Sequence, residues 1–200
     1  MLFRSLSAGR VWHKDPLPEG VEAVIVPGGF SFGDYLRCGA IARFSPIMSD
    51  LQRFADQGGQ ILGICNGFQI LCESGLLPGA LVRNDCMEFR CVNQPLRVEA
   101  SNDRFNRDVL GEKLSLPIAH GEGNYRADED VLAGLESNNQ VLLRYIDNPN
   151  GSINHIAGIR NQSGNVYGMM PHPERAVEHH HPCLDGLPVL RAFLHPLRSE

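Results

Sequence analysis

The sequence predicts an α/β fold in three layers, with a mostly parallel sheet between helices and a small antiparallel extension. Apolar, largely β-branched runs at 21–26 and 60–64 indicate strands that are buried on both faces, as in parallel sheets. An amphipathic segment separates these runs, and alternation of strands and helices favours parallel pairing with right-handed crossovers. Beyond residue 86 strand patterns follow one another with few helices, and this change predicts the antiparallel extension.

The first complete helix is expected at 45–59. Ser45 is suited to cap it, Pro46 to occupy its first turn, and Gly58 with Gly59 to end it. Its apolar residues recur at helical spacing and should face the sheet: Ile47, Met48, Leu51, Phe54 and Ala55.

A second helix is expected at 67–74, a short exposed one at 128–137 and a last one at 184–197. The last helix should turn four leucines toward the sheet: Leu187, Leu190, Leu194 and Leu197. Further strand patterns lie at 87–101, 116–120, 140–145, 155–160 and 166–170. Asn150-Gly151 and the run 161–165 are turn signals, and the strands beside the second turn should pair antiparallel.

Composition and charge limit the classes of function that fit this chain. The chain has 200 residues, enough for one domain spanning 1–200, with 42% hydrophobic and 20% charged residues. A net charge of −5 without a dense Lys/Arg run argues against a nucleic-acid or membrane-surface role. No apolar run approaches the ~20 residues of a membrane span, and the N-terminus lacks the apolar core of a signal peptide. These features predict a cytoplasmic protein.

Six cysteines are scattered without a framework of close pairs, so most should be free thiols. Cys86 and Cys91 have no second pair to complete a zinc site, and no metal site is predicted there. The run 178–183 (EHHHPC) holds donors for a metal, but adjacent histidines on one loop rarely converge on one ion. A plain loop before the last helix is the simpler interpretation.

Cys65 lies at the centre of G-I-C-N-G, which has the spacing of a nucleophile elbow with cysteine in place of serine. A nucleophile on a tight strand-to-helix turn needs small neighbours, and Gly63 and Gly67 meet that need. The next helix points its N-terminus at the sulfur and favours the thiolate. The N–H of Asn66 is in position to bind an oxyanion. The alternative is a buried structural cysteine, which is the preferred interpretation for Cys72.

A thiol nucleophile needs a base and a group that orients the base. His172 is flanked by Pro171 and Pro173, which favour an extended backbone in which residues two apart point to the same side. His172 and Glu174 should therefore face each other. The imidazole could hold one proton against the carboxylate while its other nitrogen faces the thiolate.

The runs GICNGFQIL and MMPHPE resemble the class I, or triad, glutamine amidotransferases, whose fold is flavodoxin-like. The longer runs PGGFSFGDYLRCGAIA, HGEGNY, DNPNGS and GMMPHPERA are similar to those of the group of glutaminase subunits that serve phosphoribosylformylglycinamidine synthases. The resemblance covers the chain from about residue 21 to the last helix.

The resemblance implies that Cys65 attacks the side-chain amide of L-glutamine, that His172 moves the proton and that Glu174 orients His172. Gly29 and Asn66 would form the oxyanion hole. Glutamine-binding residues would come from the second helix and the HGEGNY run: Gln69, His120, Gly121, Glu122 and Gly123. A capping role for Gln69 and a purely structural role for His120 are the alternatives.

The resemblance also implies partners. Ammonia would pass to a separate synthetase subunit, with a small bridging subunit, and would convert formylglycinamide ribonucleotide to the amidine in purine biosynthesis. ATP and Mg²⁺ would bind to the synthetase, because this chain has no phosphate-binding glycine motif, and no cofactor is expected here. Arg37 is either a surface residue or a contact to that partner.

The start of the sequence differs from the family pattern, in which a further strand and helix come first. Residues 1–9 are similar to the end of that helix and 10–15 to the next strand. A βα unit of about 30 residues is thus expected to be absent. The loss of a central strand would leave backbone groups unpaired.

The sequence leaves two alternative functions open: a cysteine hydrolase of the same fold, such as a peptidase or deglycase, and an inactive remnant that binds the synthetase.

Overall fold

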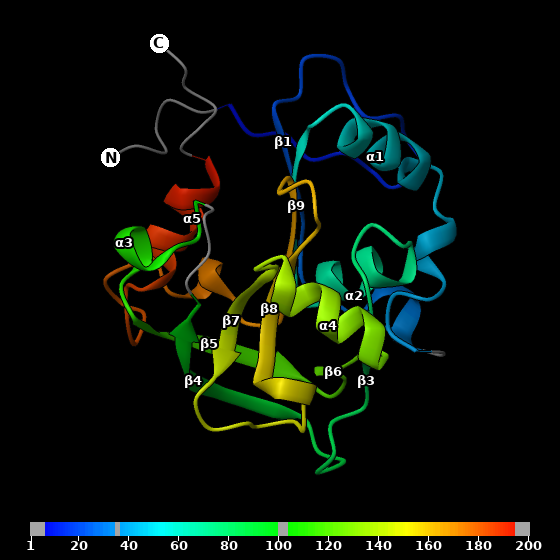
Figure 1. Ribbon diagram of the computed structural model, residues 1–200. Coiled ribbons are helices and arrows are strands. Elements are labelled where there is room, and N and C mark those ends of the chain that lie inside the picture. Colours follow the sequence, from blue (N-terminus) through cyan, green and yellow to red (C-terminus); the bar gives the residue numbers. More distant parts are fainter. Residues whose placement is uncertain (1–6, 35–36, 100–103, 195–200) are drawn as a thin grey trace.

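The computed structural model describes residues 7–34, 37–99 and 104–194, and Figure 1 shows a large sheet with helices packed around it. The strands are β1 (Ala23–Val26), β2 (Gln60–Ile64), β3 (Ala80–Val82), β4 (Arg90–Val98), β5 (Lys113–His120), β6 (Asn124–Arg126), β7 (Val141–Tyr145), β8 (Ile156–Arg160) and β9 (Val166–Met169). Seven of them form one sheet in the order β1-β2-β9-β8-β7-β4-β5, and β3 pairs with β6 in a second sheet. The predicted α/β class is confirmed.

The helices are α1 (Ile47–Asp56), α2 (Asn66–Glu73), α3 (Arg107–Leu110), α4 (Glu129–Ser137) and α5 (Gly186–Leu194). In Figure 1, α1 and α2 lie on one side of β9, and α3 with α5 lies on the other. Successive residues of β9 face these two layers. Tyr167 meets the rings of Phe105 and Phe193 at 4.8 and 6.2 Å, whereas Gly168 lies against Phe68 of α2.

The sheet is mixed, which corrects the prediction of a mostly parallel one. β1, β2 and β9 pair in parallel, but the pairs β9–β8, β8–β7, β7–β4 and β4–β5 are antiparallel. The predicted antiparallel pairing of β8 with β9 is confirmed. The antiparallel part is larger than expected because β5 begins three residues before the predicted strand, and β4 and β5 pair over most of their length.

The first strand of the sheet is at an edge, and it is less covered than the sequence indicated. β1 has a partner on one side only among the described residues, and Ile25 is 44% exposed. The strand expected at 10–15 is not formed. A turn occupies this segment, closed by a hydrogen bond from Asp15 N–H to the Trp12 carbonyl (2.8 Å). The helix end expected at 1–9 falls mostly outside the described residues.

The predicted apolar face of α1 is confirmed, since Met48, Leu51 and Ala55 are buried and two neighbours pack beside them. The predicted cap is wrong. Pro46 is the cap residue and makes no side-chain cap, while the Ser45 hydroxyl lies 3.0 Å from Nδ1 of His13. A serine before a helix has several possible partners, and here tertiary contact with residue 13 prevails over the local one.

The buried face of α5 differs from the predicted leucine stripe. Val189, Ala192 and Phe193 are buried, whereas Leu187, Leu190 and Leu194 are half-buried. Leu197 lies outside the described residues. The rotation of α5 is set at its first residue, because a methyl group built at Gly186 would lie 1.9 Å from the Pro173 carbonyl oxygen.

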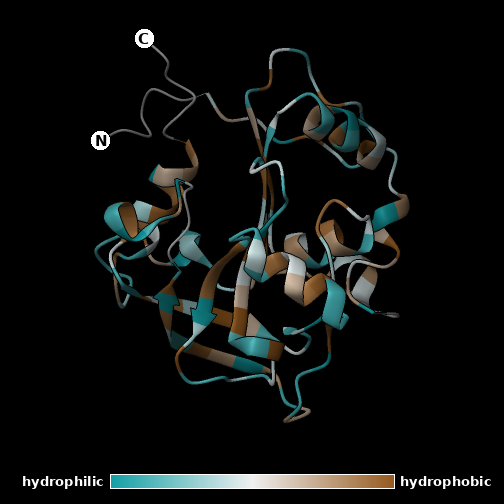
Figure 2. Cartoon of the chain, viewed as in Figure 1, coloured by the Kyte–Doolittle hydropathy of each residue, from teal (hydrophilic) through white to brown (hydrophobic). Residues whose placement is uncertain are grey.

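Hydrophobic side chains concentrate on the sheet and the faces that cover it, as Figure 2 shows for the central strands. Among the described residues no helix has both the length and the apolar character needed to cross a membrane.

The close approach of α2 to β9 makes Gly168 a sensitive position. We expect Gly168→Ala to lower the free energy of unfolding by about 1–3 kcal/mol, because the added carbon would lie 2.1 Å from the buried ring of Phe68. Urea denaturation measures the change. The matched control is Gly134→Ala on α4, where a methyl group meets nothing within 4 Å, so helix propensity should make that variant equal or up to about 1 kcal/mol more stable. Equal stability of the two variants would contradict the packing argument.

Candidate active site

Cys65 occupies the turn between β2 and α2, in a backbone conformation that L residues rarely adopt (φ 50°, ψ −107°). Its N–H donates to the Met169 carbonyl (2.8 Å), so the end of β9 holds the turn. A methyl group at Gly67 would lie 1.9 Å from the Val26 carbonyl oxygen, and one at Gly63 would lie 2.8 Å from the Gly67 backbone. The structure confirms the predicted elbow shape of this turn and the need for glycine at both positions.

His172 follows β9, the parallel neighbour of β2, and its Nδ1 lies 2.6 Å from Oε1 of Glu174. Its backbone N–H donates to the Pro117 carbonyl (2.7 Å). The ring is buried, and its Nε2 has no hydrogen-bond partner among the described residues. The pairing of His172 with Glu174 agrees with the prediction, although a 3₁₀ turn at Pro173–Arg175, not an extended chain, makes it. Glu174 is 42% exposed at its side chain, so the pair spans the boundary with solvent.

Gly28 brings the cysteine and the histidine to one place. A methyl group built on it would lie 2.8 Å from Cε1 of His172 and 3.5 Å from Cβ of Cys65. Both side chains therefore border the same point at the end of β1. Cys65 is 5% exposed, and its Sγ lies 3.7 Å from the Ala119 carbonyl. The carboxyl ends of three adjacent parallel strands thus converge here, where ligands bind in open α/β sheets.

Two backbone groups are predicted to bind an oxyanion: that of Asn66, next to the cysteine, and that of Gly29, next to Gly28. Asn66 is the first residue of α2, where the N–H has no partner inside the helix. Gly29 lies in the loop after β1, and a methyl group built there would meet nothing within 4 Å, so that side of the loop is open. Sequence reasoning selected Gly29 and missed Gly28, whose contact with two side chains no local pattern reveals.

Gln69 connects the nucleophile helix to the loop after β5. Its Oε1 accepts from Nδ2 of Asn66 (2.9 Å), and its Nε2 donates to the Glu122 carbonyl (2.5 Å). The Glu122 carboxylate in turn accepts the N–H of Cys38 (3.0 Å). These hydrogen bonds therefore tie the loop 121–123 to α2 and to Cys38. Gly121 lies on the open side, where an added methyl group would meet only Phe89 at 3.8 Å.

His120 is buried beneath this loop and is 3% exposed. Its Nδ1 lies 3.2 Å from Oδ1 of Asn84, and its Nε2 lies 3.5 Å from Nδ2 of Asn150. Burial is the main cause that lowers the pKa of His120 to about 4, and the nearby His172 lowers it further. His120 is therefore neutral near pH 7. These contacts support the alternative prediction, in which His120 has a structural role. Sequence reasoning did not select Asn84 and assigned Asn150 only to a turn.

Cys72 and His181 have roles outside this cluster. Burial raises the pKa of the Cys72 thiol, which extends from α2 into the core as predicted. Nδ1 of His181 accepts the N–H groups of Val177 and Glu178 (3.0 and 3.1 Å), so it organises its own loop. Across the described part of the chain, no three histidine, cysteine or acidic side chains gather as they would around a metal ion. Arg37 is half-exposed and forms a salt bridge with Glu73.

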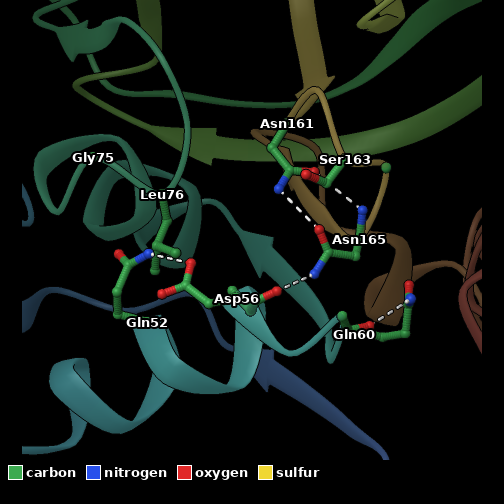
Figure 3. Close-up of a pocket in the computed structure, with 11 residues that line it drawn as sticks. Gln52, Asp56, Gln60, Gly75, Leu76, Asn161, Ser163 and Asn165 are labelled. Carbon is green, nitrogen blue, oxygen red and sulfur yellow. Dashed lines mark hydrogen bonds between the residues drawn. The ribbon is translucent and has the colours of Figure 1, made fainter.

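A hollow of ≈ 520 Å³ lies at the opposite ends of the strands (Figure 3). Its lining includes Gln60, the first residue of β2, and Asn165, which precedes β9. Asn165 donates to the carbonyls of Ala55 and Gly59 (2.8 and 2.9 Å) and thereby ties α1 to the sheet. This hollow is remote from Cys65, because the cysteine follows the other end of β2.

Comparison with known proteins agrees with this geometry. Residues 3–183 match the CobB/CobQ-like glutamine amidotransferase domain family. Over 194 residues the chain is 59% identical to the phosphoribosylformylglycinamidine synthase subunit PurQ of Synechococcus elongatus, covering 96% of this chain and 88% of that protein. The chain belongs to the PurQ family.

Two further PurQ relatives extend the comparison. The PurQ subunit of Salinibacter ruber is 56% identical over 178 residues, covering 84% of this chain and 76% of that protein. The solved structure of PurLQS from Thermotoga maritima includes a chain that is 45% identical, with a TM-score of 0.83 and coverage of 92% of this chain and 83% of that one. The recognition of the family from its motifs is confirmed.

The buried amide of Asn84 should be essential for stability in this PurQ chain. Asn84→Ala would leave the N–H of Gly123 and the carbonyls of Glu88 and His120 without their partner (2.9, 2.8 and 2.9 Å). We expect the free energy of unfolding to fall by about 2–4 kcal/mol, since buried polar groups would lose their hydrogen bonds. Chemical denaturation measures it, with Asn138→Ala as the control, because Asn138 is exposed directly after α4 and its loss should cost less than about 1 kcal/mol. A small effect of Asn84→Ala would show that water replaces the amide.

Proposed function

We propose that this chain is a glutaminase subunit that hydrolyses L-glutamine to glutamate and ammonia, with Cys65, His172 and Glu174 as its catalytic triad. The observation that carries the proposal is the arrangement at the end of the parallel strands. Glu174 holds Nδ1 of His172, Nε2 is unpartnered among the described residues, and the ring borders the same point as Cys65. Membership of the PurQ family supports it.

The reaction follows from the atoms in place. Sγ of Cys65 attacks the side-chain amide carbon of glutamine, and the thiol proton passes to Nε2 of His172. Collapse of the tetrahedral adduct breaks the C–N bond, and His172 gives its proton to the leaving nitrogen, which departs as ammonia. Water then attacks the thioester and gives a proton to His172. The C–S bond breaks, glutamate leaves and the thiol is restored.

The negative oxygen of each tetrahedral adduct needs donors that are already in place. We assign this role to the N–H groups of Asn66 and Gly29. The former is supported by its position as the first residue of α2, which also directs the positive end of the helix dipole toward the adduct. The latter is supported by the open space beside Gly29.

The loop 121–123 and Gln69 border the same site, and we assign to them the binding of glutamine. The support is their linkage. Gln69 follows Cys65 by one helical turn and donates to the Glu122 carbonyl, so a hydrogen bond joins the nucleophile helix to the loop. The N–H of Cys38 donates to one oxygen of the Glu122 carboxylate, and we assign the other oxygen to the α-ammonium group of the substrate.

We further propose that ammonia passes to a synthetase subunit that converts formylglycinamide ribonucleotide to the amidine in purine biosynthesis, with a small bridging subunit. The match to a chain of the PurLQS structure supports these partners, PurL-like and PurS-like. ATP and Mg²⁺ belong to the synthetase in this proposal, and residues 1–200 act as one amidotransferase domain without a cofactor. A cytoplasmic location agrees with the substrate and with cysteines that form no disulfide among the described residues.

Removal of the thiol tests the central step. We expect Cys65→Ala to lower glutamine hydrolysis at least about 10³-fold, because no other group can form the thioester. Ammonia release is measured with and without the chain's own synthetase partner and ATP. The control is Cys91→Ala, which removes an exposed thiol and should retain wild-type activity. Hydrolysis of peptides but not of glutamine would favour the hydrolase alternative, and a folded wild-type chain inert with every partner would favour the remnant.

The carboxylate of Glu174 can be tested apart from the sulfur. Glu174→Gln should lower kcat by about 10²–10⁴-fold, because an amide no longer stabilises the imidazolium or fixes its tautomer. Steady-state kinetics at pH 7 measures the change. Glu178→Gln is a matched control, since Glu178 pairs with the exposed His180 at 3.3 Å and lies outside the site. Equal kcat for both variants would remove Glu174 from the triad.

A further inference from the structure

His120 lies between two asparagine side chains whose orientations are determined by other hydrogen bonds. Nδ2 of Asn84 donates to the carbonyls of Glu88 and His120 (2.8 and 2.9 Å), so its Oδ1 is the atom that faces Nδ1 of the ring. Nδ2 of Asn150 donates to the Gly123 carbonyl (2.8 Å) and faces Nε2. Because Oδ1 can only accept and Nδ2 can only donate, the ring proton lies on Nδ1 and the lone pair on Nε2.

This arrangement disfavours a charged ring. A second proton, on Nε2, would face the donor group of Asn150 instead of an acceptor. Burial also opposes the charge, and burial is the main cause that lowers the pKa of His120 to about 4. The ionisable group whose field acts on this ring, among the described residues, is His172. Positive charge on His172 therefore also disfavours charge on the His120 ring.

The same asparagines hold the loop above the ring. Oδ1 of Asn84 accepts the N–H of Gly123 (2.9 Å), while Asn150 and the hydroxyl of Ser152 donate to its carbonyl (2.8 and 3.2 Å). A methyl group at Gly123 would lie 2.3 Å from Cε1 of His120, so the loop backbone lies directly on the imidazole. The position of loop 121–123, and with it the Glu122 carbonyl that Gln69 holds, therefore depends on this ring.

We propose that His120, Asn84 and Asn150 are positioning residues, in which a permanently neutral imidazole supports loop 121–123 and keeps a second positive charge away from His172. In this role His120 touches neither glutamine nor the reacting atoms. The part that concerns His172 and glutamine rests on the proposed function, whereas the tautomer and charge of His120 do not.

The charge state is tested without any activity. The side-chain nitrogens of the histidines in the full chain are followed by ¹⁵N NMR from pH 5 to 8, and His120 is identified by the signal missing in His120→Asn. We expect His120 to remain neutral and protonated on Nδ1 throughout. If that variant does not fold, Asn150→Asp identifies the signal by the shift of Nε2. A ring that gains a proton near pH 6.5, or that carries its proton on Nε2, would overturn the proposal.

Kinetics separates positioning from acid–base catalysis. In His120→Asn the new amide can still donate to Asn84 but cannot titrate within this range. With the synthetase partner present, we expect KM for glutamine to rise about three- to tenfold, kcat to stay within about threefold, and the pH dependence of kcat/KM to be unchanged. The control is His179→Asn, which changes an exposed histidine and should leave all three unchanged.

Two outcomes of the kinetic experiment count against the proposal: a fall in kcat of about 100-fold or more, and the loss of one ionisation from the pH profile. Asn150→Asp provides the converse test, because a carboxylate beside Nε2 can accept a proton from the ring. There we expect a titration of His120 to appear between pH 5 and 8, together with a pH-dependent KM. If the wild-type chain hydrolyses no glutamine with its partner, the proposed function fails, while the NMR result still decides the state of His120.

Discussion

The site depends on one close approach, between the backbone at the start of α2 and the end of β1. At Gly67 there is no room for even a methyl group beside the Val26 carbonyl oxygen. This contact holds the start of the nucleophile helix against the end of β1, and Cys65, directly before the helix, has a positive φ of 50°. Such a conformation is unfavourable by about 1–3 kcal/mol and persists only where the surrounding structure determines it. Here β2, fully buried from Ile61 onward, supplies that constraint.

The two buried histidines illustrate how environment divides roles between identical side chains. His172 has a carboxylate at one nitrogen and, among the described residues, no partner at the other, so that nitrogen is open to the reacting atoms. His120 has amide groups at both nitrogens, so its proton stays in place. A neutral amide matches a neutral ring, whereas a carboxylate favours the imidazolium. The side chains that face the ring nitrogens thus decide whether a histidine transfers protons or supports the structure.

The mixed sheet explains how residues from its parallel and antiparallel strands meet at one end of the sheet. The parallel strands bring the loops after β1, β2 and β9 together, because parallel strands end at the same side. The antiparallel strands add the end of β5, from which His120 and loop 121–123 extend toward the same place. A wholly parallel sheet would have required a helix between each pair of strands and would have left less room for this second source of residues.

The sequence by itself determined the features that consecutive residues encode. The glycines around Cys65, the prolines around His172 and the spacing of Glu174 from His172 each predict a local arrangement of side chains. Motifs of this kind also identified the family. Only the tertiary structure decided how most of the strands pair, which side of α5 is buried, and which partners Ser45 and His120 contact. Asn84 and Asn150 lie 36 and 30 residues from His120 in the chain. Hydrogen bonds across such separations depend on how whole strands are placed, and a single sequence contains no local signal for that placement.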